Sequence, residues 1–200
     1  MKKKIIALPV LLAASAVFGM AAPMTFTAGL SGPAEEPPNA STATGYTLVT
    51  IDPVAHTLRV VVSYSGILSG VTASHIHVIN GLLDPNVLDT LGPVATQTPS
   101  FLGFPTTPTG FYDETFNTSL ASSFRAPYVT AAGSVPAAEA ALFAGIMSGR
   151  AYLNVHSSAF PSGEIRGFLE PVPEPATIGL AGAALVGLVL ARRVRKSAEA

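Results

Sequence analysis

The sequence predicts an all-β domain, a sandwich or a barrel, carried between two terminal segments that direct export. Short runs rich in β-branched and aromatic residues recur through the middle of the chain, bounded by Gly, Pro, Asn and Asp. The 200 residues include 18 Gly and 17 Pro, too many for a bundle of membrane helices. Only 12% of the residues are charged, and the apolar excess lies at the two ends.

The N-terminal segment predicts a secretory signal peptide. Three lysines follow the initiating methionine, an uncharged apolar run covers residues 5–18, and small residues come next. This order of basic, apolar and small-residue parts is typical of a signal peptide. Because Pro23 directly after Ala22 would hinder cleavage there, we expect signal peptidase to cut after Ala21. Residues 1–21 are then removed.

The first predicted strands cover residues 24–30, 44–51 and 57–64. Asp52 and Pro53 separate the second from the third, so these two are expected to pair as a hairpin. In the third, Leu58 and Val60 would face the core while Arg59 faces the other way. Further strands are expected over residues 72–79, 111–116, 150–156 and 164–169.

One short helix and one long loop complete the expected domain. Ser134 can cap a helix that has Pro136 in its first turn, continues over residues 137–147 and is followed by a glycine. Residues 80–110 are rich in Pro, Thr and Gly, with a short strand expected around Val87. Because this segment is long for a loop, we expect it to be functional or mobile.

The histidines are the candidate site. His75 and His77 lie two residues apart in an expected strand, so both imidazoles face the same side. His156 ends another strand and can supply a third ligand, while Glu164 is a candidate fourth ligand or a group that orients a ligand. Copper or zinc suits such a set. The alternative is a hydrogen-bonded network that fixes the sheet, with Arg166 and Glu164 as an ion pair.

Other chemistry finds little support. The sequence has no nucleophile elbow, no phosphate loop and no His-Glu-x-x-His motif, so we expect no enzyme. Glu35 and Glu36 are neighbours in an extended segment and would point apart, and His56 lies in a turn. With no Cys, disulfides, thiol nucleophiles and Cys-ligated metals are excluded.

The charge distribution excludes nucleic acid as a partner. Seven of the 11 basic residues lie at the two ends of the chain, which leaves four arginines against eleven acidic residues between positions 22 and 175. A body with this excess of negative charge repels phosphate backbones.

The C-terminal segment has three parts. The residues Pro173, Glu174 and Pro175 come first, and an uncharged apolar run over residues 176–191 follows. As a single transmembrane helix this run would span roughly 24 Å, less than the roughly 30 Å of a hydrocarbon core. Cations after it place the C-terminus in the cytoplasm and the domain outside. They are Arg192, Arg193, Arg195 and Lys196.

These three parts resemble a PEP-CTERM sorting signal over residues 171–196. The resemblance implies processing by an exosortase-type protease near the Pro-Glu-Pro, after a transient stay in the inner membrane. It also implies a final place at the cell surface or outside the cell, in a setting of exopolysaccharide production. A plain membrane anchor is the alternative.

The body between the two signals, residues 22–170, resembles the CHRD domain named after the repeats of chordin. The likeness rests on residues 30–38, 74–77, 149–156 and 163–167. It implies a Greek-key, immunoglobulin-like β-sandwich loosely similar to copper/zinc superoxide dismutase. This chain lacks the full ligand set of that enzyme. The family's signature positions here are His75, His77, His156, Glu164 and Arg166.

Two functions remain open. The first is a non-enzymatic structural or binding component of the extracellular matrix, whose loops, especially residues 80–110, contact a polysaccharide or a matrix protein. The second is a copper or zinc metalloprotein that uses the three histidines for storage, sensing or redox activity.

Overall fold

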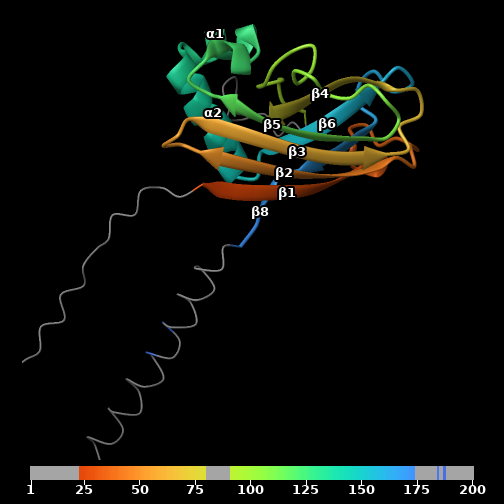
Figure 1. The fold of residues 1–200 in the computed structure, drawn as a ribbon, viewed down its shortest axis with the longest axis horizontal. Helices are drawn as coiled ribbons and strands as arrows, with labels where there is room; N and C mark the ends of the chain where they lie inside the picture. The colour runs from red at the N-terminus through yellow and green to blue at the C-terminus, as the bar shows by residue number, and fades with distance from the viewer. Residues whose placement is uncertain (1–22, 80–90, 174–183, 185–186, 188–200) are drawn as a thin grey trace, which may run out of the picture.

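The computed structural model describes residues 23–79 and 91–173, together with residues 184 and 187. Its eight strands form one antiparallel sheet in the order β4-β6-β7-β1-β2-β3-β5, with β8 also paired to β1 (Figure 1). The strands are β1 (Met24–Ser31), β2 (Thr44–Asp52), β3 (Thr57–Ser65), β4 (Val71–Val78), β5 (Gly110–Asn117), β6 (Ala151–Ser157), β7 (Ile165–Phe168) and β8 (Glu170–Pro171).

The sheet is curled into a half-barrel, and the described residues do not show the two separate sheets of the expected sandwich. Strand β1 pairs with β2 along all eight residues, but pairs with β7 only between Ser31 and Arg166. The short strand β8 pairs with β1 at Phe26 and Thr27. Because these narrow pairings keep β1 connected on both sides, the sheet bends there and stays continuous. Its concave side encloses the hydrophobic core.

The expected strands are confirmed to within one or two residues, and β8 is an addition. The predicted hairpin pairs β2 with β3 from Thr44 and Ser65 to Asp52 and Thr57. Its turn forms because the Asp52 carboxylate accepts hydrogen bonds from two of the next backbone N–H groups, each at 2.9 Å.

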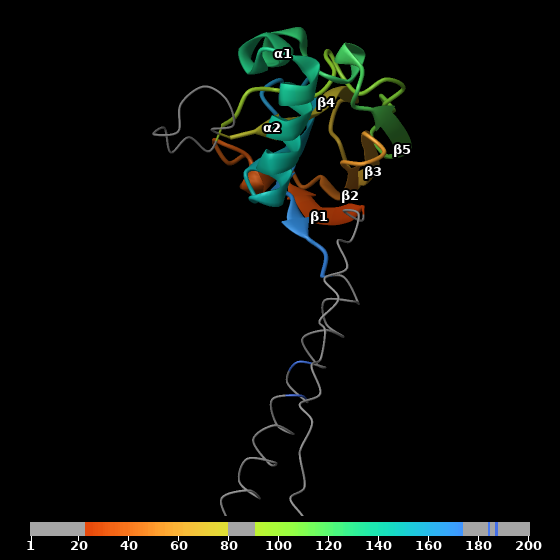
Figure 2. The ribbon, with the colours of Figure 1, turned by 90° about the vertical axis from the view of Figure 1, so that its left-hand side faces the viewer.

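The structure has two α-helices where the sequence predicted one. The predicted helix is α2 (Val135–Met147), whose first turn donates the Ala137 N–H to the Ser134 hydroxyl. The additional helix α1 (Ala126–Ala132) ends at Gly133, whose left-handed φ of 88° suits glycine. Figure 2 shows α2 lying across one open end of the curl. It packs closely there, because a Cβ on Gly145 would lie 2.5 Å from Val78.

The described part of the long loop, residues 91–109, closes the gap between the two edge strands of the sheet. Along β4, the Ala95 N–H donates to Ile76 and the Phe101 N–H donates to Ser74. Toward β5, the Tyr112 hydroxyl donates to the Leu102 carbonyl. Ala95, Phe101 and Phe104 are buried in the core. These residues therefore have a structural role, and the strand expected around Val87 lies outside the described residues.

Both ends of the described domain lie at the same end of the sheet, since β1 begins there and β8 pairs beside it. Ala21, Glu174, Pro175 and the expected transmembrane run at 176–191 lie outside the continuously described ranges. No single described helix has the length and apolarity needed to cross a membrane. The pair α1 and α2 meets the criteria only jointly, with a bend of 96°.

Candidate metal centre

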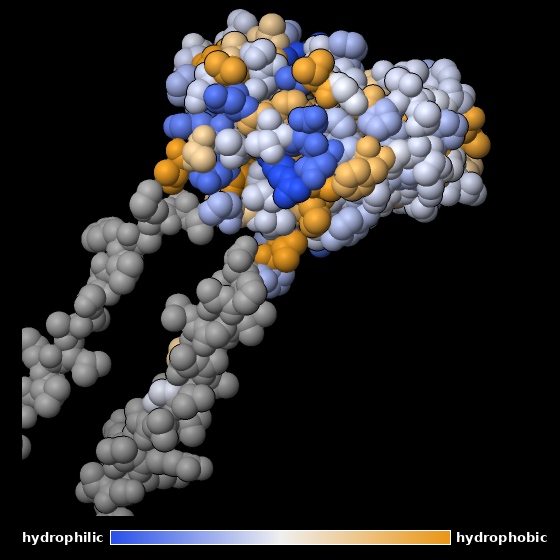
Figure 3. Space-filling model, in the orientation of Figure 1, coloured by the Kyte–Doolittle hydropathy of each residue, from blue (hydrophilic) through white to orange (hydrophobic). Residues whose placement is uncertain are grey.

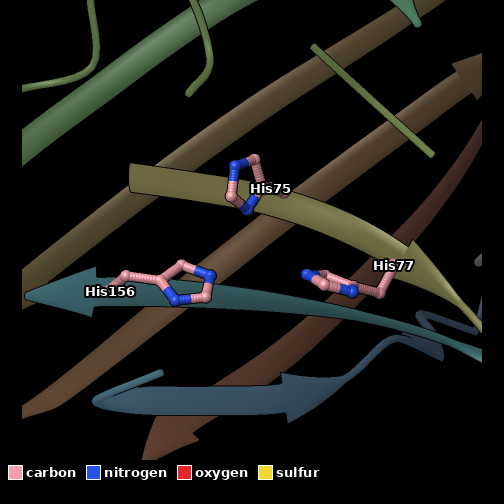
Figure 4. A group of neighbouring side chains, drawn as sticks. All are labelled: His75, His77 and His156. Carbon is pink, nitrogen blue, oxygen red and sulfur yellow. The ribbon is translucent and has the colours of Figure 1, made fainter. Parts of the chain in front are cut away.

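Three histidines meet on the outer face of β4 and β6. In the pairing of these strands, His77 lies opposite Tyr152 and Ala73 lies opposite His156. Because Ile76 on β4 points into the core, its neighbours His75 and His77 point outward. One nitrogen of each imidazole is turned toward a common centre (Figure 4). One ring nitrogen from each histidine lies within 4.8 Å of the other two.

A backbone carbonyl orients each imidazole. A neutral imidazole carries one N–H, so a ring nitrogen that contacts a carbonyl carries the proton and leaves the lone pair on the other nitrogen. The three contacts join His75 Nε2 to Pro99 O at 2.6 Å, His77 Nδ1 to Gly92 O at 2.8 Å and His156 Nδ1 to Pro161 O at 2.9 Å.

The remaining ring nitrogens are buried acceptors without a hydrogen-bond partner. They are Nδ1 of His75, Nε2 of His77 and Nε2 of His156. Leaving a buried polar group unsatisfied costs roughly 1–3 kcal/mol. Metal-ligating histidines have this arrangement, with one nitrogen on the metal and the other donating to a carbonyl or carboxylate.

Burial keeps these imidazoles neutral. Desolvation lowers the pKa of His75 and of His77 to about 4, against the opposing effect of the bonds to Pro99 and Gly92. Burial also lowers the pKa of His156. At pH 7 all three rings therefore have free lone pairs, as metal binding requires.

The spacing fits a small divalent ion. Ligand nitrogens of a tetrahedral zinc lie about 3.3 Å apart, given zinc–nitrogen bonds of about 2.0–2.1 Å. Nitrogens that lie within 4.8 Å of one another would need to approach by up to about 1.5 Å to reach this spacing. Three imidazoles without a thiolate suit zinc or copper.

Glu164 does not join the histidines. It precedes β7, and its buried carboxylate accepts hydrogen bonds from the Ser41 hydroxyl at 2.7 Å and the Leu68 N–H at 3.1 Å. Nor is it the ion-pair partner expected for Arg166. The Nε of Arg166 lies 3.9 Å from Oε2 of Glu35 and donates to the carbonyl of Ala34.

Two further residues of this face were not singled out from the sequence as part of the site. The ring of Tyr152 stacks on that of His77, with centroids 4.7 Å apart and planes at 11°. The guanidinium of Arg166 lies 4.9 Å from the Tyr152 centroid. Asn154 lies opposite His75, is almost fully buried and has an Oδ1 without a hydrogen-bond partner. Strand alternation places both residues on the same face as His156 and so could have indicated them.

His56 has a different environment. Its Nδ1 lies 2.9 Å from Oε2 of Glu139 on α2, and the Thr118 hydroxyl donates to the same carboxylate. This contact joins the β2–β3 turn to the helix, so His56 does more than occupy the turn in which the sequence placed it.

Comparison with known families identifies two segments of the chain. The chain belongs to the CHRD domain family, whose model matches residues 26–169 and so covers the half-barrel and the three histidines. The segment after it, residues 171–196, matches the PEP-CTERM protein-sorting motif, which implies export, processing by exosortase and sorting to the cell surface. The comparisons with curated proteins and with solved structures found no match.

Proposed function

We propose that this CHRD protein binds one copper or zinc ion at the cell surface through His75, His77 and His156, and that it is not an enzyme. One observation carries the proposal: three buried ring nitrogens, each without a partner, lie together while the opposite nitrogens are fixed by carbonyls. A purely structural network would be expected to satisfy these acceptors, because buried polar groups are almost always hydrogen-bonded.

Asn154 is the residue best placed to complete the coordination. Its Oδ1 is a buried oxygen that forms no well-aligned hydrogen bond, and the Asn154 side chain lies close enough to His77 to raise the pKa of that ring against the larger lowering by desolvation. Zinc sites with three protein ligands keep a fourth position for water. Asn154 would either take that position or accept a hydrogen bond from the water that does. Ser41 and Leu68 hold Glu164, which we therefore leave out of the ligand set.

The absence of an enzymatic activity is a proposal with its own support. Within the described residues, the close group of metal-ligating side chains consists of the three imidazoles alone. Among the residues that the structure describes, no carboxylate lies within this group to act as a general base on a metal-bound water. Retention of the ion, for storage or sensing, is what this arrangement supports.

The setting we propose is the extracellular matrix, with exopolysaccharide or a matrix protein as partner, after removal of the signal peptide at Ala21 and release from the inner membrane. The sorting motif supports this setting. The intact mass of protein recovered from cell-surface material tests it. We expect a mass that lacks residues 1–21 and the segment beyond the Pro-Glu-Pro. A product that retains residues 176–200 would instead be a membrane-anchored protein.

Metal analysis tests the site. Protein recovered from the cell surface should contain about one copper or zinc per chain, and adding the metal to stripped protein should raise the melting temperature by mass action. The double variant His75→Ala/His77→Ala should lose both effects. His56→Ala, which removes a histidine outside the site, should keep them. The proposal would be refuted if the native protein is recovered without metal and its melting temperature does not change when copper or zinc is added.

A further inference from the structure

Two aromatic side chains stand exposed on the outer face of the other half of the sheet. Tyr46 on β2 is 49% exposed and Phe111 on β5 is 66% exposed. Ser63 on β3 pairs with both of them, so the three residues form one row across three strands. Two strand spacings separate the aromatic positions by about 10 Å.

A shallow hollow borders this row. It has a volume of about 440 Å³ and is lined mainly by hydroxyl-bearing and glycine residues, with no charged side chain. Figure 3 shows that this end of the sheet is of intermediate hydropathy, whereas the surface toward the helices is strongly hydrophilic. The hydroxyl-bearing residues that line the hollow from the outer face are Thr44, Tyr46, Ser63, Ser65 and Thr109, whereas the Tyr64 hydroxyl is buried on the other side and donates to the carbonyls of Pro105 and Thr107.

The geometry points to a binding site for a neutral polysaccharide with an extended backbone. The apolar C–H face of a sugar ring stacks on an exposed aromatic ring, and its hydroxyls exchange hydrogen bonds with groups such as the Ser63 and Ser65 hydroxyls. The spacing of Tyr46 and Phe111 would engage two sugars separated by one other. This inference rests on the proposed matrix setting and specifies its partner.

The chemistry of the hollow favours sugar over other polymers. A nucleic acid or a charged peptide would need ionic partners, and the lining residues provide none. The pair of rings also differs from a continuous apolar patch for protein docking, because the small polar Ser63 lies between them.

The site stays accessible even while the chain is still held through its C-terminal segment, before release. The chain leaves the domain near Met24, where β1 begins and β8 pairs beside it. The hollow lies by Thr44, which pairs with Ser31 at the far end of β1. The eight residues of β1 span roughly 23 Å from one end to the other. Strands β2 and β3 also lie on the opposite side of the curl from β4 and β6 (Figure 1).

Calorimetric titration of the surface-recovered protein tests this inference, with cellohexaose as the neutral extended probe and an alginate oligomer as an anionic comparison. We expect cellohexaose to bind and alginate not to bind. Tyr46→Ala and Phe111→Ala should each weaken binding by about tenfold, the loss of one stacking contact. Leu102→Ala, which removes another exposed apolar side chain, should leave binding unchanged.

Failure here is separable from failure of the metal site. The His75→Ala/His77→Ala variant should still bind cellohexaose, and Tyr46→Ala/Phe111→Ala should still bind metal. The inference is overturned if cellohexaose does not bind, or if the aromatic double variant binds it as the native protein does. It is also overturned if that variant instead converts a native dimer to a monomer, because the row would then be a contact between copies.

Discussion

The two outer faces of the curled sheet are built in opposite ways. On β2 and β3, buried and more exposed residues alternate, and Arg59 and Asp113 form an ion pair in solvent. On β6, both faces are covered: Tyr152 and Asn154 are as inaccessible as the core residue Leu153 on the other side. Loops carrying Gly92, Pro161 and Ala34 contact the side chains of this second face.

This difference shows which face of the sheet carries polar groups that do not stabilise the fold. The exposed face of β2 and β3 leaves its polar side chains in water, where they lose little. The covered face of β6 and its neighbours β4 and β7 buries Arg166, Asn154 and three histidine rings, and the Asn154 Oδ1 and one nitrogen of each ring form no hydrogen bond. Such groups destabilise a protein unless a ligand satisfies them, so the covered face is where a ligand is to be sought.

Loss of the buried cation should have the largest effect. Arg166→Met removes a buried guanidinium that donates to the Ala34 carbonyl, lies over the Tyr152 ring and is 3.9 Å from the Glu35 carboxylate, so the free energy of unfolding should fall by about 3–5 kcal/mol. Urea unfolding measures it. Adding Glu35→Gln should recover part of the loss, since the amide carries no charge. A double variant no more stable than the single one would show that the ion pair is not the cause.

Acid should destabilise the covered face specifically. Because burial lowers the pKa of His75 and His77 from 6.5 to about 4, the unfolded chain binds more protons between these values. The stability of metal-free protein is then complete above pH 6.5 and is lost as the pH falls toward 4, by roughly 3 kcal/mol for the buried His75. Urea midpoints across this range measure the loss.

The ionisation of Glu35 makes stability depend on pH in the opposite direction, so this residue serves as the control. Desolvation raises its pKa from 4.5 to about 7, although Arg166 lowers it. The stabilisation that protonated Glu35 contributes to the fold is therefore present below pH 4.5 and is lost as the pH rises toward 7. In Glu35→Gln the fall in stability on acidification should be steeper than in the native protein. An unchanged slope would mean that the carboxyl does not titrate in this window.

Asn154 should matter for the metal more than for the fold. Replacing it with Ala removes an amide whose Oδ1 has no protein partner, so metal affinity should fall by roughly 10–100-fold. Competition with a coloured chelator measures the affinity. Equal affinity in Asn154→Ala and native protein would exclude this residue from the coordination.

Breaking the ion pair on the exposed face should leave the stability of the protein unchanged. Arg59→Ala breaks the bidentate pair with Asp113, formed at 2.8 and 2.7 Å, yet both groups stay in water. Exposed ion pairs contribute little, so the melting temperature should not change measurably. A clear drop would show that the two outer faces differ less than their burial indicates.

Much of the fold could be predicted because its signals are local. Alternation along β3 and the turn at Asp52 specify the hairpin, and the two-residue spacing of His75 and His77 places both on one face. The curl could not be predicted, since it depends on the pairing of Ser31 with Arg166, far apart in the chain. The short helix α1 offered only Pro127 and Gly133 as signals.

The candidate site, too, could be predicted from the sequence only where its signals are local. The three histidines could be found from strand periodicity and from the family resemblance. Glu164 was misplaced because β7 begins one residue later, at Ile165, and its side chain turns toward Ser41. The contact of Arg166 with Glu35 could not be predicted, since Glu35 comes from a segment more than a hundred residues away.

X-ray absorption on the zinc-loaded protein is the most direct test that the covered face is a metal centre. We predict three imidazole nitrogens at about 2.0 Å with one further light ligand, and loss of one imidazole in His156→Ala. A first shell of oxygen atoms alone, identical in native protein and in His156→Ala, would contradict the assignment.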